Sequence, residues 1–333
     1  MNEKKISVIV PAYNAEETIE RCVVRIFQGE YRNIEIIVVN DGSTDRTEEI
    51  VQKLSRQDDR IKLISQDNQG VAVARNTGLK HASGDYIAWC DADDWYEPDC
   101  LELLCEFLES YDADIALCRS QIPGRQDVYD SSEVQVWDRD GAIEAFLEDK
   151  LLNGVLWNKL IRRELFDGIE FDPSLRFWED LDVMWRVLQR VSKVVRFNQA
   201  KYNYSVSPET LTAKRYSHER FCSSWKVWDR VVEDCHKPGS EQFLQKAVQR
   251  RYLWLYGDLR LMLKDHYDRD DDKEMIQSLM RKEGIRGLSY LPGFLNRTYA
   301  IVCMISLPLA ETACRFIYKE KAATYEEGNY QTD

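Results

Sequence analysis

The chain has 333 residues, of which 44% are hydrophobic, and its formal net charge is −13. This length predicts one large α/β domain followed by an extension, and the hydrophobic content excludes a chain that is disordered throughout. The negative charge excludes a general nucleic-acid binder, because phosphate backbones need a basic surface. Nine cysteines without a C-x-x-C pair predict reduced thiols and a cytoplasmic protein. The apolar run after Lys5 is too short for a signal peptide, so we expect none.

The first hundred residues predict alternating strands and helices. The expected strands are four apolar, largely β-branched runs over residues 6–10, 34–39, 61–64 and 86–90. Helices are expected after Asn14 and after Ser43 or Asp45, whose side chains suit N-caps, and over residues 71–81. Such alternation builds a parallel sheet with helices on both faces and with ligands at the carboxyl ends of its strands.

Asp91, Asp93 and Asp94 follow directly on the expected strand over residues 86–90. Carboxylates this close repel one another, and a fold keeps them in a cleft mainly where a cation or a ligand offsets that cost. Ligation by a few carboxylates, completed by water and phosphate oxygens, is what Mg²⁺ or Mn²⁺ prefers. The alternative is a strand that ends in a solvated acidic turn.

Four motifs together carry a family resemblance. They are SVIVPAYN over residues 7–14, VNDGSTD over 39–45, ARNTG over 74–78 and SGDYIAWCDADD over 83–94. In this order and spacing they resemble the family 2 glycosyltransferases, over roughly residues 4 to 215. The resemblance implies the GT-A fold, a Rossmann-like α/β fold with a mixed, mostly parallel sheet. It also implies a nucleotide-sugar donor, a divalent metal (Mn²⁺ or Mg²⁺) and transfer with inversion at the anomeric carbon.

The resemblance also implies a donor site. Its residues would be Pro11, Ala12, Tyr13, Asp41, Arg75, Asp91, Ala92 and Asp93. Tyr13 could stack on a base and Asp41 could accept the imino proton of uracil; the alternatives are core packing and an Asx-turn. Arg75 would meet the nucleotide or the diphosphate, or form a surface ion pair instead. Asp91 would lie near the ribose and Asp93 on the metal, with Asp94 as a supporting or capping residue.

Glu179 and Asp180 stand at the start of an expected helix that runs to Leu188. Acids at a helix start can simply compensate the helix dipole. An inverting transferase needs a carboxylate that takes the proton from the acceptor hydroxyl. The resemblance gives this role of general base to Asp180, with Glu179 orienting it or holding an acceptor hydroxyl.

Acceptor contacts are expected from Trp157, Lys159 and Asp94. The first two match a family segment that precedes the acid pair, and a Trp beside a Lys suits sugar stacking or a diphosphate contact. The alternative for Trp157 is core packing on a helix with Leu156 and Leu160.

The C-terminal region changes character. Residues 281–321 hold seven Lys or Arg against three Asp or Glu, inside an acidic chain. The apolar run over 288–318 is interrupted by Pro292 and Pro308, and is too broken to span a bilayer. We expect residues 285–318 either to lie on an anionic membrane surface or to form a clasp on the core or a dimer contact.

Five segments are therefore expected. They are a donor-binding half over residues 1–115, an acceptor-binding half over 116–215, a helical extension over 216–280, the membrane or clasp segment over 281–321 and a disordered tail over 322–333. The expected enzyme transfers a sugar, with a UDP-sugar as the first choice of donor, to a glycan or polyprenyl-linked saccharide. It is expected to act at the inner face of the cell membrane, and a homodimer is one option for its oligomeric state. One alternative is a catalytically silent nucleotide-sugar-binding protein. Another is a sugar-1-phosphate nucleotidyltransferase, which needs a Gly-rich basic loop where this chain has residues 11–14.

Overall fold

A computed structural model describes residues 4–123, 133–149, 151–206 and 216–322 of the chain. The chain divides into two compact units. The first, the α/β unit, comprises Met1–Ile143 and Asn153–Thr210, and the second, the helical unit, comprises Glu144–Leu152 and Leu211–Asp333. The tail expected from residue 323 onward lies outside the described residues.

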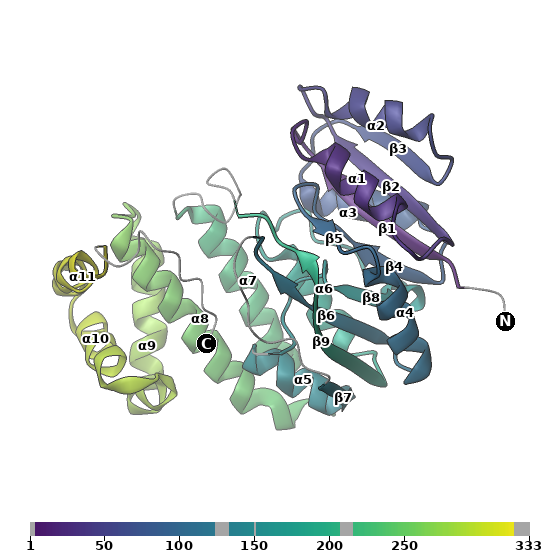
Figure 1. The fold of residues 1–333 in the computed structure, drawn as a ribbon. Coiled ribbons are helices and arrows are strands. Elements are labelled where there is room, and N and C mark those ends of the chain that lie inside the picture. The colour runs from purple at the N-terminus through teal and green to yellow at the C-terminus, as the bar shows by residue number, and fades with distance from the viewer. Residues whose placement is uncertain (1–3, 124–132, 150, 207–215, 323–333) are drawn as a thin grey trace. The chain divides into compact units, whose positions relative to one another are not determined.

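One mixed sheet forms the centre of the α/β unit (Figure 1). Its strands are β1 (Ile6–Ala12), β2 (Ile34–Asp41), β3 (Ile61–Gln66), β4 (Tyr86–Trp89), β5 (Trp95–Tyr96), β6 (Ile115–Gln121), β7 (Val134–Asp138), β8 (Lys159–Arg162) and β9 (Lys193–Asn203). They are ordered β3-β2-β1-β4-β8-β6-β9-β5, and β7 pairs with β9. Strands β3, β2, β1 and β4 are parallel, whereas β8 runs antiparallel to both β4 and β6.

Helices cover both faces of this sheet. They are α1 (Ile19–Phe27), α2 (Thr47–Ser55), α3 (Val71–His81), α4 (Cys100–Ser110) and α6 (Glu179–Leu188), with a 3₁₀ turn η1 (Arg163–Phe166). Helix α5 (Arg139–Glu148) begins in the α/β unit and ends in the helical unit. Alternate residues of β2 explain the two layers, because Ile36 and Val38 pack with α1 and α4 while Ile37 and Val39 pack with Ala74 of α3. Helix α3 approaches β1 so closely that a Cβ at Gly78 would lie 2.3 Å from Ile9 Cγ2. The ARNTG motif therefore needs glycine at this position for helix–sheet packing.

Two local predictions are wrong. Asn14 does not cap a helix, since α1 begins only at Ile19; it adopts a left-handed conformation (φ 47°) and its side-chain oxygen accepts a hydrogen bond from Thr44 N at 2.8 Å. Asn14 thus joins the loop after β1 to the loop after β2. Trp157 does not lie on a helix either, because the segment continues into strand β8. Leu156 and Leu160 have helical spacing, but the pairing of β8 with β4 and β6 determines the structure of this segment.

The helical unit contains α7 (His218–Asp234), α8 (Leu244–Lys264), α9 (Asp270–Tyr290), α10 (Gly293–Ile305) and α11 (Leu307–Ala322), with a 3₁₀ turn η3 (Glu241–Phe243). Helices α7, α8, α9 and α10 pack in this order, each on the next, and α11 returns to α8 (Figure 1). Asp272 lies buried in the first turn of α9 and accepts a hydrogen bond from Tyr267. Among the described residues, no helix is long and apolar enough to cross a membrane.

Candidate active site

The carboxyl ends of the parallel strands bring the predicted donor residues to one edge of the sheet. Tyr13 follows β1 with 53% of its surface exposed, so its ring is free to meet a ligand, while Ala12 is buried beneath it. Asp41 ends β2 and is buried. Its carboxylate accepts hydrogen bonds from Gln66 Nε2 at 2.8 Å and from Gly70 N at 2.8 Å, and this holds the loop that leads into α3.

Arg75 connects the two acidic motifs. It projects from α3 and is buried, and its guanidinium donates to Asp91 Oδ1 at 3.1 Å and to Glu179 Oε1. Burial alone would lower the pKa of Arg75, but the charges of Glu179 and Asp91 raise it above its ordinary value. The surface ion pair considered for this residue is therefore excluded. Arg75 is a fixed cation between the loop after β4 and the start of α6.

The three aspartates after β4 differ in their surroundings. Asp91 keeps 32% of its side chain exposed, and Asp93 is half-buried. Burial, and then the charge of Asp91, raise the pKa of Asp93 to about 6. Asp94 is buried, and burial followed by the charges of Asp91 and Asp93 raises its pKa to about 8. Negative charge at this loop is thus only partly compensated by the protein itself.

This loop is held by contacts that the sequence did not predict. Asp94 accepts hydrogen bonds from Tyr202 Oη and from Ser205 N, each at 2.7 Å. Arg21, exposed on α1, donates to the carbonyl oxygen of Asp93 at 2.6 Å and lies 4.0 Å from the ring centroid of Trp95. An arginine on the polar face of an amphipathic helix carries no sequence signal that separates it from other surface arginines.

The acid pair begins α6 after a strained residue. Trp178 adopts φ 64°, a left-handed conformation that a side chain of this size rarely takes, and it turns the chain into the helix. Burial raises the pKa of Glu179 to about 7, against the opposing charge of Arg75. Asp180 is half-buried, its Oδ1 accepts a hydrogen bond from Leu181 N at 2.8 Å, and burial raises its pKa.

Two of the three acceptor candidates are buried, which corrects the direct contacts expected for them. Lys159 is 0% exposed, and its ammonium donates to Val155 O at 2.6 Å and to Asn158 Oδ1 at 2.8 Å. Its charge nevertheless lowers the pKa of Asp180, so it acts on the site from within the fold. Asp94 is 1% exposed and both its oxygens are bonded. The sequence pattern could not separate these buried polar groups from surface ones.

Trp157 is half-buried in a stack of aromatic rings. Its ring centroid lies 4.4 Å from that of Tyr202 and 5.7 Å from that of Tyr204, with the ring planes within 20° of parallel. Core packing, the alternative considered for this residue, accounts for these contacts, and the exposed remainder of the ring stays available to a ligand.

The acidic loop suits a divalent cation. Among the described residues no group of three His, Cys, Asp or Glu side chains could hold a metal ion. Mg²⁺ or Mn²⁺ needs fewer protein ligands when water and phosphate oxygens complete its shell. The oxygens of Asp91 and Asp93 have the right chemistry, and a cation there would offset both the burial and the charge of Asp91 that raise the pKa of Asp93.

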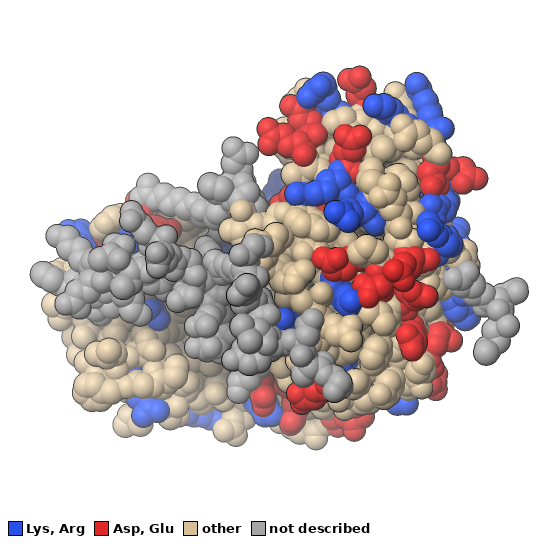
Figure 2. Space-filling view, viewed as in Figure 1, with Lys and Arg blue, Asp and Glu red and all other residues tan. Residues whose placement is uncertain are grey.

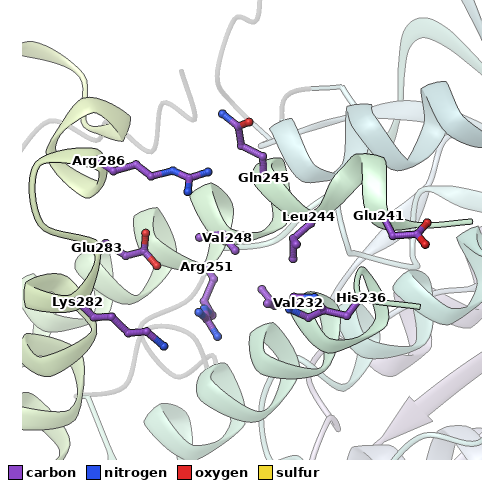
Figure 3. A pocket seen from close by; sticks show the side chains of 10 residues that line it. All are labelled: Val232, His236, Glu241, Leu244, Gln245, Val248, Arg251, Lys282, Glu283 and Arg286. Atoms are coloured by element: carbon purple, nitrogen blue, oxygen red, sulfur yellow. The ribbon is translucent and has the colours of Figure 1, made fainter. Parts of the chain in front are cut away.

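A pocket of about 400 Å³ lies in the helical unit (Figure 3). It is lined by Val232, His236, Glu241, Leu244, Gln245, Val248, Arg251, Lys282, Glu283 and Arg286. None of the predicted site residues takes part in it.

Comparison with known proteins identifies the family. Residues 7–169 match Glycosyl transferase family 2. Glycosyltransferase GlyG of Streptococcus pneumoniae serotype 4 is 30% identical over 287 residues, which cover 80% of this chain and 92% of GlyG. The chain belongs to glycosyltransferase family 2. Glycosyltransferase GlyA of the same organism is 35% identical over 221 residues, and this match spans 63% of the chain but only 32% of GlyA.

Solved structures share the fold of this family 2 glycosyltransferase. S. aureus TarS 1–349 in complex with UDP-GlcNAc superposes with a TM-score of 0.70 at 18% identity, covering 99% of this chain and 94% of TarS 1–349. Mannosyltransferase PcManGT from Pyrobaculum calidifontis, in complex with GDP-Man and Mn²⁺, gives a TM-score of 0.59 at 17% identity, covering 95% and 88%. These likenesses confirm the predicted GT-A fold.

Proposed function

We propose that this glycosyltransferase is metal-dependent and inverting, and that it moves a sugar from a UDP-sugar to a hydroxyl of a glycan or of a lipid-linked saccharide. The observation that carries the proposal is the bridge from Arg75 to both Asp91 and Glu179. It joins the loop that would hold the donor to the acid pair that would act on the acceptor. The UDP-GlcNAc bound to TarS and the Mn²⁺ bound to PcManGT support the donor and metal classes.

The donor would bind along the ends of β1, β2 and β4. Tyr13 would stack on the base, Asp41 would accept its imino proton, and Asp91 would meet the ribose. The main chain at Pro11 and Ala12 would line the base pocket, and that at Ala92 the sugar side. Asp93 would hold Mn²⁺ or Mg²⁺, which when bound neutralises charge on the diphosphate. Arg75 would hold both acidic motifs through Glu179 and Asp91 and would face the nucleotide or the diphosphate from α3.

Asp180 would be the general base. As the acceptor oxygen bonds to the anomeric carbon, the bond from that carbon to the diphosphate oxygen breaks and the hydroxyl proton passes to Asp180. A raised pKa makes its carboxylate a better base than an ordinary aspartate near neutral pH. Glu179, fixed by Arg75, would orient Asp180. A single displacement of this kind inverts the anomeric carbon and needs no second nucleophilic carboxylate.

For the setting of the reaction, we propose the cytoplasmic face of a membrane, with residues 285–318 as the contact. This placement would bring the site to a polyprenyl-linked acceptor. We also propose that residues 1–115 form the donor-binding half of the transferase and residues 116–215 its acceptor-binding half.

A donor screen tests the proposed function. Purified protein would be mixed with UDP-, GDP- and dTDP-sugars, with and without Mn²⁺, and both thermal shift and release of nucleoside diphosphate would be measured. A ligand at 100 times its Kd should stabilise the fold by about 2.7 kcal/mol. We expect a Mn²⁺-dependent shift with UDP-sugars. Stabilisation without hydrolysis or transfer of any donor would favour a nucleotide-sugar-binding protein without catalysis.

A further inference from the structure

Helix α10 is apolar on two opposite sides. Tyr299, Ala300 and Cys303 are buried against the rest of the helical unit. Phe294, Ile301 and Ile305 repeat at i, i+7 and i+11, which places them on one stripe opposite the buried one. They are 81%, 41% and 68% exposed, and Leu295 beside them is 82% exposed. A soluble helix normally presents polar side chains on its outer face, so this stripe requires an apolar partner.

The surrounding sequence lacks negative charge. No Asp or Glu occurs between Gly284 and Ala310, although the whole chain carries a net charge of −13. The charged residues of this stretch are Arg286 and Arg297, and both are exposed. In Figure 2 the surface over α10 is mostly tan with a few blue side chains, whereas both signs crowd the surface over α1, α2 and α4. The charge of this stretch is therefore positive and suits an anionic partner.

Further cations lie close by on α9. Ile285, which is 87% exposed, follows the kink of that helix at Gly284 and lies between Lys282 and Arg286 in the sequence. Figure 3 shows Lys282 and Arg286 directed toward the pocket of the helical unit, with Arg251 of α8 nearby. Glu283 points into the same pocket. Across the described residues, neither Lys282 nor Arg286 forms an ion pair with a carboxylate.

We propose that the exposed stripe of α10 lies in the headgroup layer of an anionic lipid bilayer, with Phe294 and Leu295 inserted, Arg297 on a lipid phosphate, and Lys282 and Arg286 adding positive charge from the neighbouring helix α9. The helix has 13 residues and is about 20 Å long, which suits an element lying in the membrane plane. Apolar insertion flanked by cations is the chemistry of such interfacial helices. The inference deepens the membrane contact of the proposed function by naming the inserted residues, and binding is measurable without any transfer reaction.

Point substitution is the appropriate test, because α10 also supplies core. Deleting the segment would remove Tyr299, Ala300 and Cys303 from the hydrophobic cluster of the helical unit. Replacing the outward-facing residues alone leaves that cluster intact. The full-length protein would carry Phe294→Ser with Leu295→Ser, and the control would be Val136→Ser, an exposed apolar residue (45%) on β7.

Sedimentation with sucrose-loaded vesicles gives the readout. Wild type and the Val136→Ser control should bind vesicles of phosphatidylglycerol and phosphatidylcholine, and should bind pure phosphatidylcholine much less. The F294S/L295S variant should bind the anionic vesicles at least tenfold more weakly, with unchanged circular dichroism and unchanged UDP binding. Lys282→Gln with Arg286→Gln should weaken binding about tenfold or more and flatten its dependence on salt.

Three results would overturn the proposal. The first is a wild-type protein that does not bind anionic vesicles, and the second is an F294S/L295S variant that binds them as wild type does. The third is a wild-type dimer, without vesicle affinity, that this variant converts to a monomer, since the stripe would then be an interface between copies. None of these three results depends on donor hydrolysis. Failure of the membrane proposal can therefore be told apart from failure of the proposed glycosyl transfer.

Discussion

Arg75 and Glu179, 104 residues apart in the chain, form a buried ion pair at the carboxyl edge of the sheet. The same guanidinium reaches Asp91, so one side chain fixes the positions of two acidic motifs. A buried pair of this kind contributes little net stability, because desolvation of both charges offsets their attraction. The ion pair instead fixes the positions of α3, α6 and the loop after β4 relative to one another.

The first prediction concerns this bridge. Arg75→Met leaves the buried Glu179 without its partner, and also removes the partner of the partly exposed Asp91, so the free energy of unfolding should fall by about 3 to 5 kcal/mol. Arg75→Lys should recover part of that stability but little turnover, because one ammonium cannot reproduce the fork of a guanidinium. Chemical denaturation and initial rates would measure the two effects. Wild-type turnover in Arg75→Lys would contradict the positioning role.

The second prediction concerns Asp93. If this carboxylate holds the cation, Asp93→Ala should abolish transfer and donor hydrolysis, and Mn²⁺ should no longer strengthen UDP binding. Asp94→Asn is the matched control: Asp94 is the next residue, but it is buried and its oxygens accept hydrogen bonds from Tyr202 and Ser205, so it would support the loop and not hold the cation. The control should keep Mn²⁺-dependent UDP binding. Activity of Asp93→Ala within tenfold of wild type would exclude the metal role.

The third prediction concerns Asp180. Asparagine keeps the shape of the side chain but cannot accept a proton, so Asp180→Asn should lower turnover by about 10²-fold or more. Metal-dependent UDP binding should stay nearly intact. Because the base must be ionised, wild-type turnover should decline as the pH falls through the raised pKa of Asp180, and the residual activity of the variant should lack this decline. A collapse of UDP affinity would move Asp180 to the donor site.

Much of the α/β unit could be predicted because its signals are local. Strands β1, β2, β3 and β4 are short apolar runs, and the parallel sheet then places Tyr13, Asp41 and Asp91 at one edge by topology alone. The family resemblance names these residues as donor-site candidates, and it rests on local motifs and needs no knowledge of long-range contacts.

The bridges across the site could not be predicted, because they depend on tertiary packing. The sequence positions of Arg75 and Glu179 do not predict their contact. The contact of Arg21 with the loop after β4 is not predicted either, because its sequence context is that of an ordinary surface arginine. Lys159 was expected near the acceptor but is buried in β8, where sheet pairing replaced the helical pattern of the segment. From the sequence, Asp94 could belong to a solvated acidic turn. In the structure its oxygens accept hydrogen bonds from Tyr202 and Ser205, which lie more than a hundred residues later in the chain.

The last prediction concerns the stability of the sheet at its opposite edge. Glu35 of β2 is buried, and its carboxylate accepts hydrogen bonds from Ser7 Oγ at 2.5 Å and Ser83 N at 2.7 Å and pairs with Lys5 and Lys62 at 2.9 and 2.7 Å. Burial alone would raise the pKa of Glu35, but these donors together hold it well below its ordinary value of 4.5. Its stabilising effect is therefore complete above that value and declines as the pH falls further. Glu35→Gln should lower the free energy of unfolding at pH 7 by about 3 kcal/mol.

Denaturant titrations between pH 7 and pH 3 measure this effect of Glu35. The gap in stability between wild type and Glu35→Gln should shrink as the pH drops below 4.5, because the unfolded chain then binds a proton at Glu35 while the folded chain, in which the pKa of Glu35 is lowered, does not. Asp85→Asn is the control: Asp85 pairs with Lys4 at an exposed site, so its loss should cost about 1 kcal/mol or less. A Glu35→Gln variant as stable as this control at pH 7 would show that the buried network contributes nothing beyond a surface ion pair.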